Sequence, residues 1–204
     1  MKAIIFDFDG VILDTETPSF ESWCALYEER GLTLALSDWH CGVGTRDGFD
    51  PFAPFDPGEH EKIRARRMQW VTARLQGARP RPGIEPLIKA AHGRGIRMGV
   101  ASSSGSAWVE TWLLKLGFRD YFECVCTRER VKQVKPDPAL YQLALCDLGI
   151  HPGDAIAIED SAHGAAAALA AGLRCYVFPN SVTASMRFPE QAVLIDALDG
   201  VLTA

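Results

Sequence analysis

Residues 4–14 form an apolar run that is interrupted by two aspartates, Asp7 and Asp9, and by Gly10. Side chains two positions apart on a strand point to the same face, and a buried parallel strand is normally apolar throughout. Two carboxylates at the end of such a strand repel each other and resist removal from water, unless a cation or a shared proton offsets their charge. Gly10 lets the backbone turn sharply and approach a ligand. The run therefore predicts a functional site at the end of a buried strand.

The same residues have a simpler interpretation. The strand could end at Phe6, with Asp7 and Asp9 as solvated turn residues, since Asp and Gly are common in turns. The choice between the two depends on which residues the rest of the chain brings to the same place.

Composition narrows the class of protein. With 204 residues, 48% of them hydrophobic and 23% charged, the chain can form one sizeable core or a core with a smaller insert. Its net charge of −5 argues against nucleic acid or an anionic membrane as the main partner. Because it has no apolar run of the ~20 residues that span a membrane and no signal-peptide pattern, we expect a cytoplasmic protein. No heptad pattern stands out, so we expect a monomer.

The six cysteines do not have the paired spacing of a zinc site. Cys124 and Cys126 alternate within a short apolar run, which predicts reduced thiols buried in a strand.

Strand and helix patterns alternate along the chain. Apolar runs predict strands at 3–8, 96–101, 124–127, 155–158, 175–178 and 192–195. Helical patterns lie between them at 83–93, 106–116, 137–148 and 162–171. This alternation is typical of an α/β fold with a Rossmann-like parallel sheet that is covered by helices on both faces. Right-handed crossovers place all the strand C-termini at one edge of the sheet, where ligands bind.

One connection is too long for a simple crossover. About 70 residues separate the first predicted strand from Pro82-Gly83, and helical patterns at 17–30 and 59–76 lie within them. We therefore expect an inserted small α-helical domain at 14–82 and an α/β core made of 1–13 and 83–204.

Polar residues follow the predicted strands or precede the predicted helices at that one edge. They are Asp7, Asp9, Ser102, Ser103, Lys135, Glu159 and Asp160. Each alone has an ordinary explanation as a turn residue, a solvated lysine or a helix N-terminal acid. Their shared placement is what predicts a site.

The chemistry that these residues can perform together is phosphoryl transfer. Carboxylates of Asp7 and Asp160 suit Mg²⁺, a hard cation that prefers oxygen ligands. Asp7 can attack phosphorus to form an aspartyl phosphate. Asp9 would then act as the general acid for the leaving alkoxide and as the base for the attacking water. Ser102 and Lys135 would bind the phosphoryl oxygens.

The order and type of these motifs resemble the haloacid dehalogenase superfamily over nearly the whole chain. Asp7–Glu16 is similar to the first family motif, Ala101–Ser104 to the second, Lys135-Pro136 to the third and Ile158–Gly164 to the fourth. The subfamily that the chain resembles carries a helical cap after the first motif. That subfamily includes β-phosphoglucomutases and small sugar-phosphate phosphatases.

The resemblance implies a role for each motif residue. Asp7 would be the nucleophile and Asp9 the acid and base. Mg²⁺ would be held by Asp7, the Asp9 carbonyl and Asp160, with Glu159 nearby. The residues implied to bind the substrate phosphate are Ser102, Ser103, Lys135 and Gly10. The predicted function is thus a Mg²⁺-dependent phosphatase that hydrolyses a small phosphate monoester, such as a sugar phosphate.

A sugar phosphomutase of the β-phosphoglucomutase type is the main alternative. Mutases that resemble this chain often carry histidine where Ser19 stands, and their insert is longer, so both differences favour a phosphatase. Arg46 and Arg67 are candidate substrate contacts of the insert. Arg67 could instead lie with Arg64 on a solvated helix face, where Arg64 pairs with Glu61.

A phospho-accepting signalling module is a second alternative. It too combines a strand-end aspartate, Mg²⁺, a hydroxyl residue and a lysine on a parallel sheet. The long insert and the presence of Asp9 argue against it.

Overall fold

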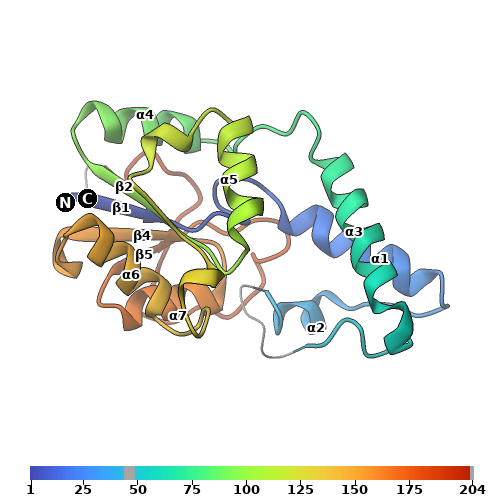
Figure 1. The fold of residues 1–204 in the computed structure, drawn as a ribbon. Coiled ribbons are helices and arrows are strands. Elements are labelled where there is room, and N and C mark those ends of the chain that lie inside the picture. The colour runs from blue at the N-terminus through green and yellow to red at the C-terminus, as the bar shows by residue number, and fades with distance from the viewer. Residues whose placement is uncertain (44–48, 203–204) are drawn as a thin grey trace.

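The computed structural model describes residues 1–43 and 49–202, in which one parallel sheet has helices on both faces and a helical region at one end (Figure 1). The strand order is β3-β2-β1-β4-β5-β6, and each neighbouring pair is parallel. The strands are β1 (Ala3–Phe6), β2 (Arg97–Ala101), β3 (Cys124–Cys126), β4 (Ala155–Glu159), β5 (Arg174–Val177) and β6 (Val193–Leu194). The predicted α/β fold class is confirmed.

The two faces of the sheet are covered by different helices. On one face lie α4 (Ile84–Gly93) and α5 (Ser106–Lys115), and on the other α6 (Ala139–Leu148) and α7 (Ala162–Ala170) (Figure 1). Alternate residues of β1 separate into two buried clusters, because successive side chains of a strand point to opposite faces. Ile4 and Phe6 belong to the first cluster, and Ala3 and Ile5 to the second.

The segment between β1 and α4 is helical. It contains α1 (Glu16–Glu28), α2 (Leu36–His40) and α3 (His60–Arg74), and α2 lay outside the predicted helices. Single 3₁₀ turns complete the described helices: η1 (Pro57–Glu59), η2 (Arg119–Tyr121), η3 (Arg128–Arg130) and η4 (Pro152–Asp154).

This helical segment has an apolar cluster of its own. The rings of Trp23 and Tyr27 of α1 pack at an angle against the ring of Phe55, and Ile63 of α3 joins them. We refer to the segment as the cap. Its division from the core at residues 13/14 and 82/83 stays a prediction.

The first strand is shorter than predicted. β1 ends at Phe6 rather than at Phe8, because Phe8 begins a turn in which its carbonyl accepts from Ile12 and Leu13. Gly10 completes the turn with a positive φ of 77°. The simpler interpretation was therefore right about the strand end, but not about solvation, because Asp7 is buried and Asp9 is half-buried.

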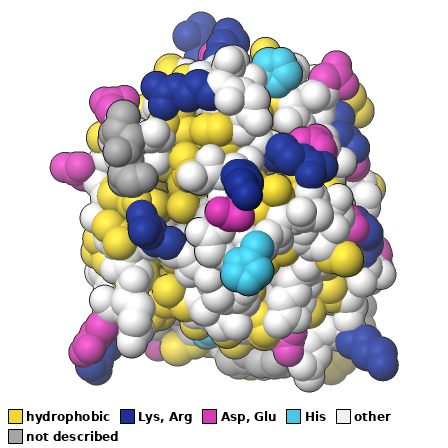
Figure 2. Space-filling model, turned by 90° about the vertical axis from the view of Figure 1, so that its left-hand side faces the viewer, with side chains coloured by type: hydrophobic (Ala, Val, Ile, Leu, Met, Phe, Trp, Pro, Cys, Tyr) yellow, Lys and Arg dark blue, Asp and Glu magenta, His cyan; other side chains and the backbone are white. Residues whose placement is uncertain are grey.

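Cys124 and Cys126 are buried on β3 as free thiols, as predicted. The end of the core farthest from the cap presents a mixed surface in which Lys and Arg side chains are interspersed with Asp and Glu (Figure 2). Within the described ranges, none of the helices has the length and apolar character that crossing a membrane requires.

Candidate active site

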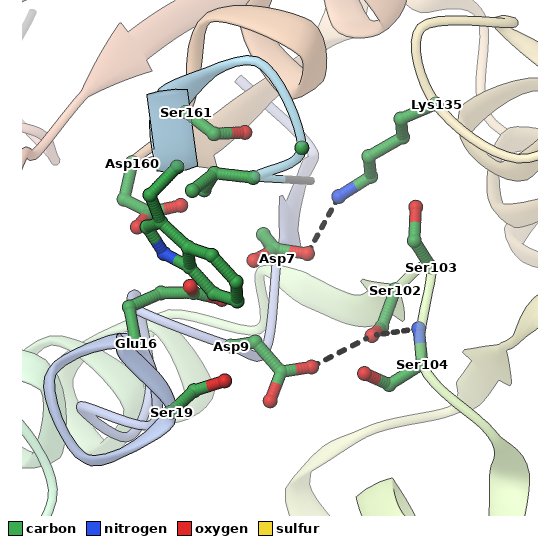
Figure 3. A pocket seen from close by; sticks show the side chains of 13 residues that line it. Asp7, Asp9, Glu16, Ser19, Ser102, Ser103, Ser104, Lys135, Asp160 and Ser161 are labelled. Carbon is green, nitrogen blue, oxygen red and sulfur yellow. Dashed lines mark hydrogen bonds and ion pairs between the residues drawn. The ribbon is translucent and has the colours of Figure 1, made fainter. Parts of the chain in front are cut away.

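A cavity of about 200 Å³ lies where β1, β2 and β4 end, between the sheet and the cap (Figure 3). Most of its lining residues are polar. They are Asp7, Asp9, Glu16, Ser19, Trp39, Gly42, Val43, Ser102, Ser103, Ser104, Lys135, Asp160 and Ser161. Six of the eight core residues that the sequence singles out as site residues therefore line one cavity, while Glu159 and Gly10 lie directly behind it.

Lys135 is the central cation on the side of the cavity that the sheet forms, which we call the sheet side. Its Nζ lies 2.5 Å from Asp7 Oδ1 and 2.6 Å from Glu159 Oε1, and only 2% of its surface is exposed. Asp7 directly follows β1, while Glu159 is the last residue of the neighbouring β4. The sheet therefore brings both carboxylates to one ammonium group.

Glu159 is held by several donors besides Lys135. The Tyr141 hydroxyl donates to Oε1 at 2.5 Å, and the Ser161 hydroxyl donates to Oε2 at 3.3 Å. The Asp160 amide donates to Oε2 at 3.2 Å. This carboxylate thus orients Lys135, and its implied part in metal binding stays a prediction.

Asp160 is positioned by Asn180. The Asn180 side-chain amide donates to Asp160 Oδ2 at 2.6 Å, while Asn180 Oδ1 accepts from the backbone amides of Val182 and Thr183. Gly10 lies so close that a Cβ there would be 2.0 Å from Asp160 Oδ2. Glycine is therefore required here for close packing. The Gly10 amide donates to the Leu13 carbonyl, and the phosphate contact that the family resemblance implies for Gly10 stays a prediction.

The charges of this cluster are not balanced. Burial raises the pKa of Asp7 and of Asp160 well above the ordinary value, and the neighbouring carboxylates add to the effect. Burial lowers the pKa of Lys135, but the charges of Asp7 and Glu159 outweigh it and raise that pKa above its ordinary value. One ammonium therefore faces three buried carboxylates.

These residues fit a hard divalent cation. Carboxylate oxygens of Asp7, Glu159 and Asp160 lie within 4.8 Å of one another. All are oxygen donors of the kind that Mg²⁺ prefers, and a cation would offset the charge that burial penalises. The acidic cluster therefore satisfies the chemical requirements of a Mg²⁺ site.

Asp9 lies across the cavity from Asp160 and is held differently. Its Oδ1 accepts from the Thr15 hydroxyl at 2.8 Å and from Trp108 Nε1 at 2.9 Å, and its Oδ2 accepts from the Ser102 hydroxyl at 3.3 Å. Figure 3 shows Asp9 and Ser102 side by side at one wall, with Ser103 next in the loop. A carboxylate in this place can exchange a proton with a group bound in the cavity.

The cap supplies a further part of the wall, next to Asp9, through α1. Figure 3 shows Glu16 and Ser19 on this wall. Burial, together with the charges of Asp9 and Asp14, raises the pKa of Glu16 to about 8. Glu16 is thus the fourth carboxyl group that lines the cavity, after Asp7, Asp9 and Asp160.

Arg67 of α3 does not lie on a solvated helix face. Its Nη2 donates to the Ser19 hydroxyl at 3.0 Å, its Nε donates to the Ser22 hydroxyl at 2.9 Å, and its guanidinium lies over the Trp23 ring. Burial lowers its pKa to about 10. The solvated interpretation was wrong for Arg67 because the guanidinium turns inward against α1, whereas Arg64 is exposed and pairs with Glu61 as expected. Arg46 lies outside the described residues.

A larger hollow of about 670 Å³ opens beside the cavity, between α3 and α5. Arg67 and Met68 line it from the cap, and Trp108 and Trp112 line it from the core. It shares Asp9, Glu16, Ser19 and Ser104 with the smaller cavity, so the two spaces adjoin.

Sequence reasoning missed several residues that hold the site. They are Thr15, Glu16, Trp108, Tyr141 and Asn180. Thr15 and Glu16 lie in the first motif and could have been weighed there. The side chains of Trp108 and Tyr141 reach the site from helices, and nothing in a helical pattern indicates which residue faces a strand end. Asn180 begins an Asn-Ser-Val-Thr turn, a pattern that indicates a turn and not its contact with Asp160.

The haloacid dehalogenase-like hydrolase family matches residues 4–178. The chain belongs to this family. YhcW of Bacillus subtilis is 40% identical to the hydrolase over 195 residues, which cover 93% of this chain and 89% of YhcW. The fructose-1-phosphate phosphatase YqaB of Escherichia coli is 32% identical over 179 residues, covering 83% of this chain and 92% of YqaB.

A solved structure shares both the fold and part of the sequence. The crystal structure of a CbbY mutant from Rhodobacter sphaeroides in complex with xylulose-(1,5)bisphosphate superposes with a TM-score of 0.79 at 29% identity. The match covers 97% of the hydrolase and 94% of that chain. Family and relatives together identify the hydrolase as a phosphoric monoester hydrolase, as the motifs predict.

Proposed function

We propose that the hydrolase removes phosphate from small phosphorylated sugars, with Asp7 as the nucleophile and Mg²⁺ as the cofactor. The observation that carries this proposal is the buried Asp7–Lys135 pair on one side of the cavity, with Asp9 on the other side next to Ser102. A nucleophile, a fixed cation and a proton donor surround one space of suitable size for a phosphoryl group.

In the first step, an Asp7 carboxylate oxygen forms a bond to phosphorus while the bond from phosphorus to the sugar oxygen breaks. Asp9 gives its proton to that leaving oxygen. Lys135 and Ser102, with Ser103, hold the remaining phosphoryl oxygens and stabilise their charge. In the second step, Asp9 takes a proton from a water whose oxygen attacks phosphorus, and the bond to Asp7 breaks to release phosphate.

Asp7, Asp160 and the Asp9 carbonyl, with Glu159 close by, would hold the Mg²⁺ ion. When bound, the ion neutralises negative charge on the phosphate and on the acidic cluster. Its positive charge also favours the ionised form of Asp7, the form that can attack phosphorus.

The substrate class follows from the relatives and the cap wall. YqaB is named for fructose 1-phosphate, and the CbbY structure contains a sugar bisphosphate. In the hydrolase, Glu16 and Ser19 present oxygens of the kind that bind sugar hydroxyls, and Arg67 lies behind them in the adjoining hollow. Trp39 also lines the cavity, and its indole Nε1 is buried with no hydrogen-bond partner within the described ranges. Such a donor can be satisfied by an acceptor on a bound ligand.

A phosphate-release screen tests the proposal. Sugar phosphates, nucleotides and 4-nitrophenyl phosphate are assayed with Mg²⁺ and with a chelator, and we expect metal-dependent release that is fastest for a sugar phosphate. Incubation of β-glucose 1-phosphate with glucose 1,6-bisphosphate, read as glucose 6-phosphate, runs in parallel. Isomerisation faster than phosphate release would replace the phosphatase by the phosphomutase. Failure to release phosphate from any ester would reject both.

Replacement of Asp9 tests the acid and base step. Asp9→Asn keeps the shape of the side chain but cannot carry the proton, so we expect both formation and hydrolysis of the aspartyl phosphate to slow by about 10²–10⁴-fold. Rapid-quench measurement of the phosphorylated protein separates the two rates. An unchanged hydrolysis rate would show that another group activates the water.

A further inference from the structure

Trp108 is the only residue of α5 whose side chain donates to Asp9 among the parts of the chain that the structure describes. Its Nε1 lies 2.9 Å from Asp9 Oδ1, and the Thr15 hydroxyl donates to the same oxygen at 2.8 Å. The other oxygen, Oδ2, lies 3.3 Å from the Ser102 hydroxyl at the cavity wall. The two oxygens of Asp9 therefore have different surroundings.

The chemistry of the donors makes this difference matter. The hydroxyls of Thr15 and Ser102 can donate or accept, so each can adapt to a protonated or an ionised Asp9. An indole N–H can only donate. As long as the Trp108 bond persists, Oδ1 acts as an acceptor, and a proton on Asp9 is favoured on Oδ2, because a protonated carboxyl oxygen is a poor acceptor.

Packing holds the indole in this place. Trp108 lies in the first turn of α5, and its ring meets that of Trp112 edge to face, with the ring centroids 5.6 Å apart. Trp112 is in turn almost fully buried in the core. Because a packed aromatic ring loses little conformational freedom on making a hydrogen bond, it is well suited to orient another side chain.

We propose that Trp108 is a positioning residue that fixes Asp9 with Oδ2 toward the substrate. This inference rests on the proposed phosphatase function and extends it. In the first step the Oδ2–H bond breaks and the proton passes to the sugar oxygen as that oxygen leaves phosphorus. In the second step Oδ2 takes a proton from the attacking water. The Trp108 N–H keeps Oδ1 out of both transfers.

The test removes the N–H and retains an aromatic ring. Trp108→Phe is compared with Trp112→Phe, a matched change in the neighbouring ring, which packs against Trp108 and is not among the donors to Asp9 described above. For each protein, kcat/KM is measured with 4-nitrophenyl phosphate and with a simple alkyl phosphate. This parameter reports the steps up to phosphoryl transfer. An acidic nitrophenol leaves without a proton, whereas an alkoxide requires one.

We expect Trp108→Phe to lower kcat/KM about 10–100-fold for the alkyl ester, a part of the usual contribution of a general acid. For the nitrophenyl ester the change should stay within about 3-fold, as the proton is not needed. Trp112→Phe should lower both values equally or leave both unchanged. In an Asp9→Asn background, Trp108→Phe should have no further effect on the alkyl ester, because the group that it positions no longer carries a proton.

Equal losses for the two esters, or full additivity with Asp9→Asn, would overturn the proposal and leave Trp108 with a packing role only. If Trp108→Phe does not fold, 3-benzothienylalanine at position 108 provides the same comparison, because sulfur replaces the N–H in a ring of similar size. Wild-type hydrolysis of both esters is measured first. If the wild type hydrolyses neither ester, the phosphatase function itself is rejected. If the wild type hydrolyses both esters but Trp108→Phe lowers the two kcat/KM values equally, only the role of Trp108 is rejected.

Discussion

The sheet side and the cap side of the cavity differ in how their charged groups are held. On the sheet side, Lys135 contacts two carboxylates and Asp160 is held by Asn180, all of them buried. On the cap side, Glu16 is half-buried, and no hydrogen bond joins its carboxyl group to another of the described residues. A chemical step requires charged groups that are already hydrogen-bonded and held in place. A group without hydrogen-bond partners can instead be satisfied by a bound ligand.

The largest expected effect lies on the sheet side. Asp7→Asn removes the proposed nucleophile and should reduce phosphate release by at least about 10⁴-fold, as loss of an essential nucleophile does in other hydrolases. The thermal unfolding curve should change little, because Lys135 keeps its contact with Glu159. Ser19→Ala on the cap side should change kcat/KM by no more than about 10-fold. Similar losses in the two variants would remove the distinction between the sides.

A second prediction concerns the stability of the buried cluster. Lys135→Met leaves Asp7 and Glu159 without their cation and should lower the free energy of unfolding by about 3–5 kcal/mol. Lys2→Met breaks an exposed ion pair with Asp154, which solvent screens, and should lower the free energy of unfolding far less. Urea unfolding of both variants and the wild type provides the comparison. An equally small loss in Lys135→Met would mean that the cluster is not charged in the folded protein.

The contrast between the two sides also explains what the sequence could predict. Asp7 and Asp160 follow strands, and Lys135 precedes a helix at the same edge of the sheet. Because parallel strands bring their C-terminal ends together, these three residues could be placed in one site from the sequence alone. Strand order, register and the exact end of β1 depend on tertiary hydrogen bonds such as the one from the Asp7 amide to the Ile158 carbonyl. Those contacts have no local sequence signal.

The cap side was much harder to predict. The helices α1 and α3 were expected, but the direction in which Arg67 points depends on how α3 packs against α1. An arginine on a charge-rich helix gives no sign of turning inward over Trp23. Glu16 was visible in the first motif, but its importance comes from the closeness of Asp9 and from burial beneath the cap. Both are properties of the folded chain.

The smallest expected effect tests the cap side through pH. The pKa of Glu16 is raised from 4.5 to about 8, so between these values the folded protein binds a proton that the unfolded chain does not. The free energy of unfolding must therefore fall as the pH rises through this range, and the loss is complete above pH 8. Glu16→Gln removes this dependence. Relative to the wild type, we expect the variant to gain a few degrees in Tm at pH 9 and little at pH 5.

The control for this measurement is Glu21→Gln, an exposed position on the same helix, measured at the same pH values. A pH-dependent difference for Glu16→Gln alone would mean that the cap holds an unpaired carboxyl group at the cavity. A bound sugar hydroxyl could then satisfy that group and gain affinity from it. A difference that stays constant from pH 5 to pH 9 would mean that Glu16 is solvated. Substrate recognition would then have to come from Ser19, Arg67 and the hollow beside α5.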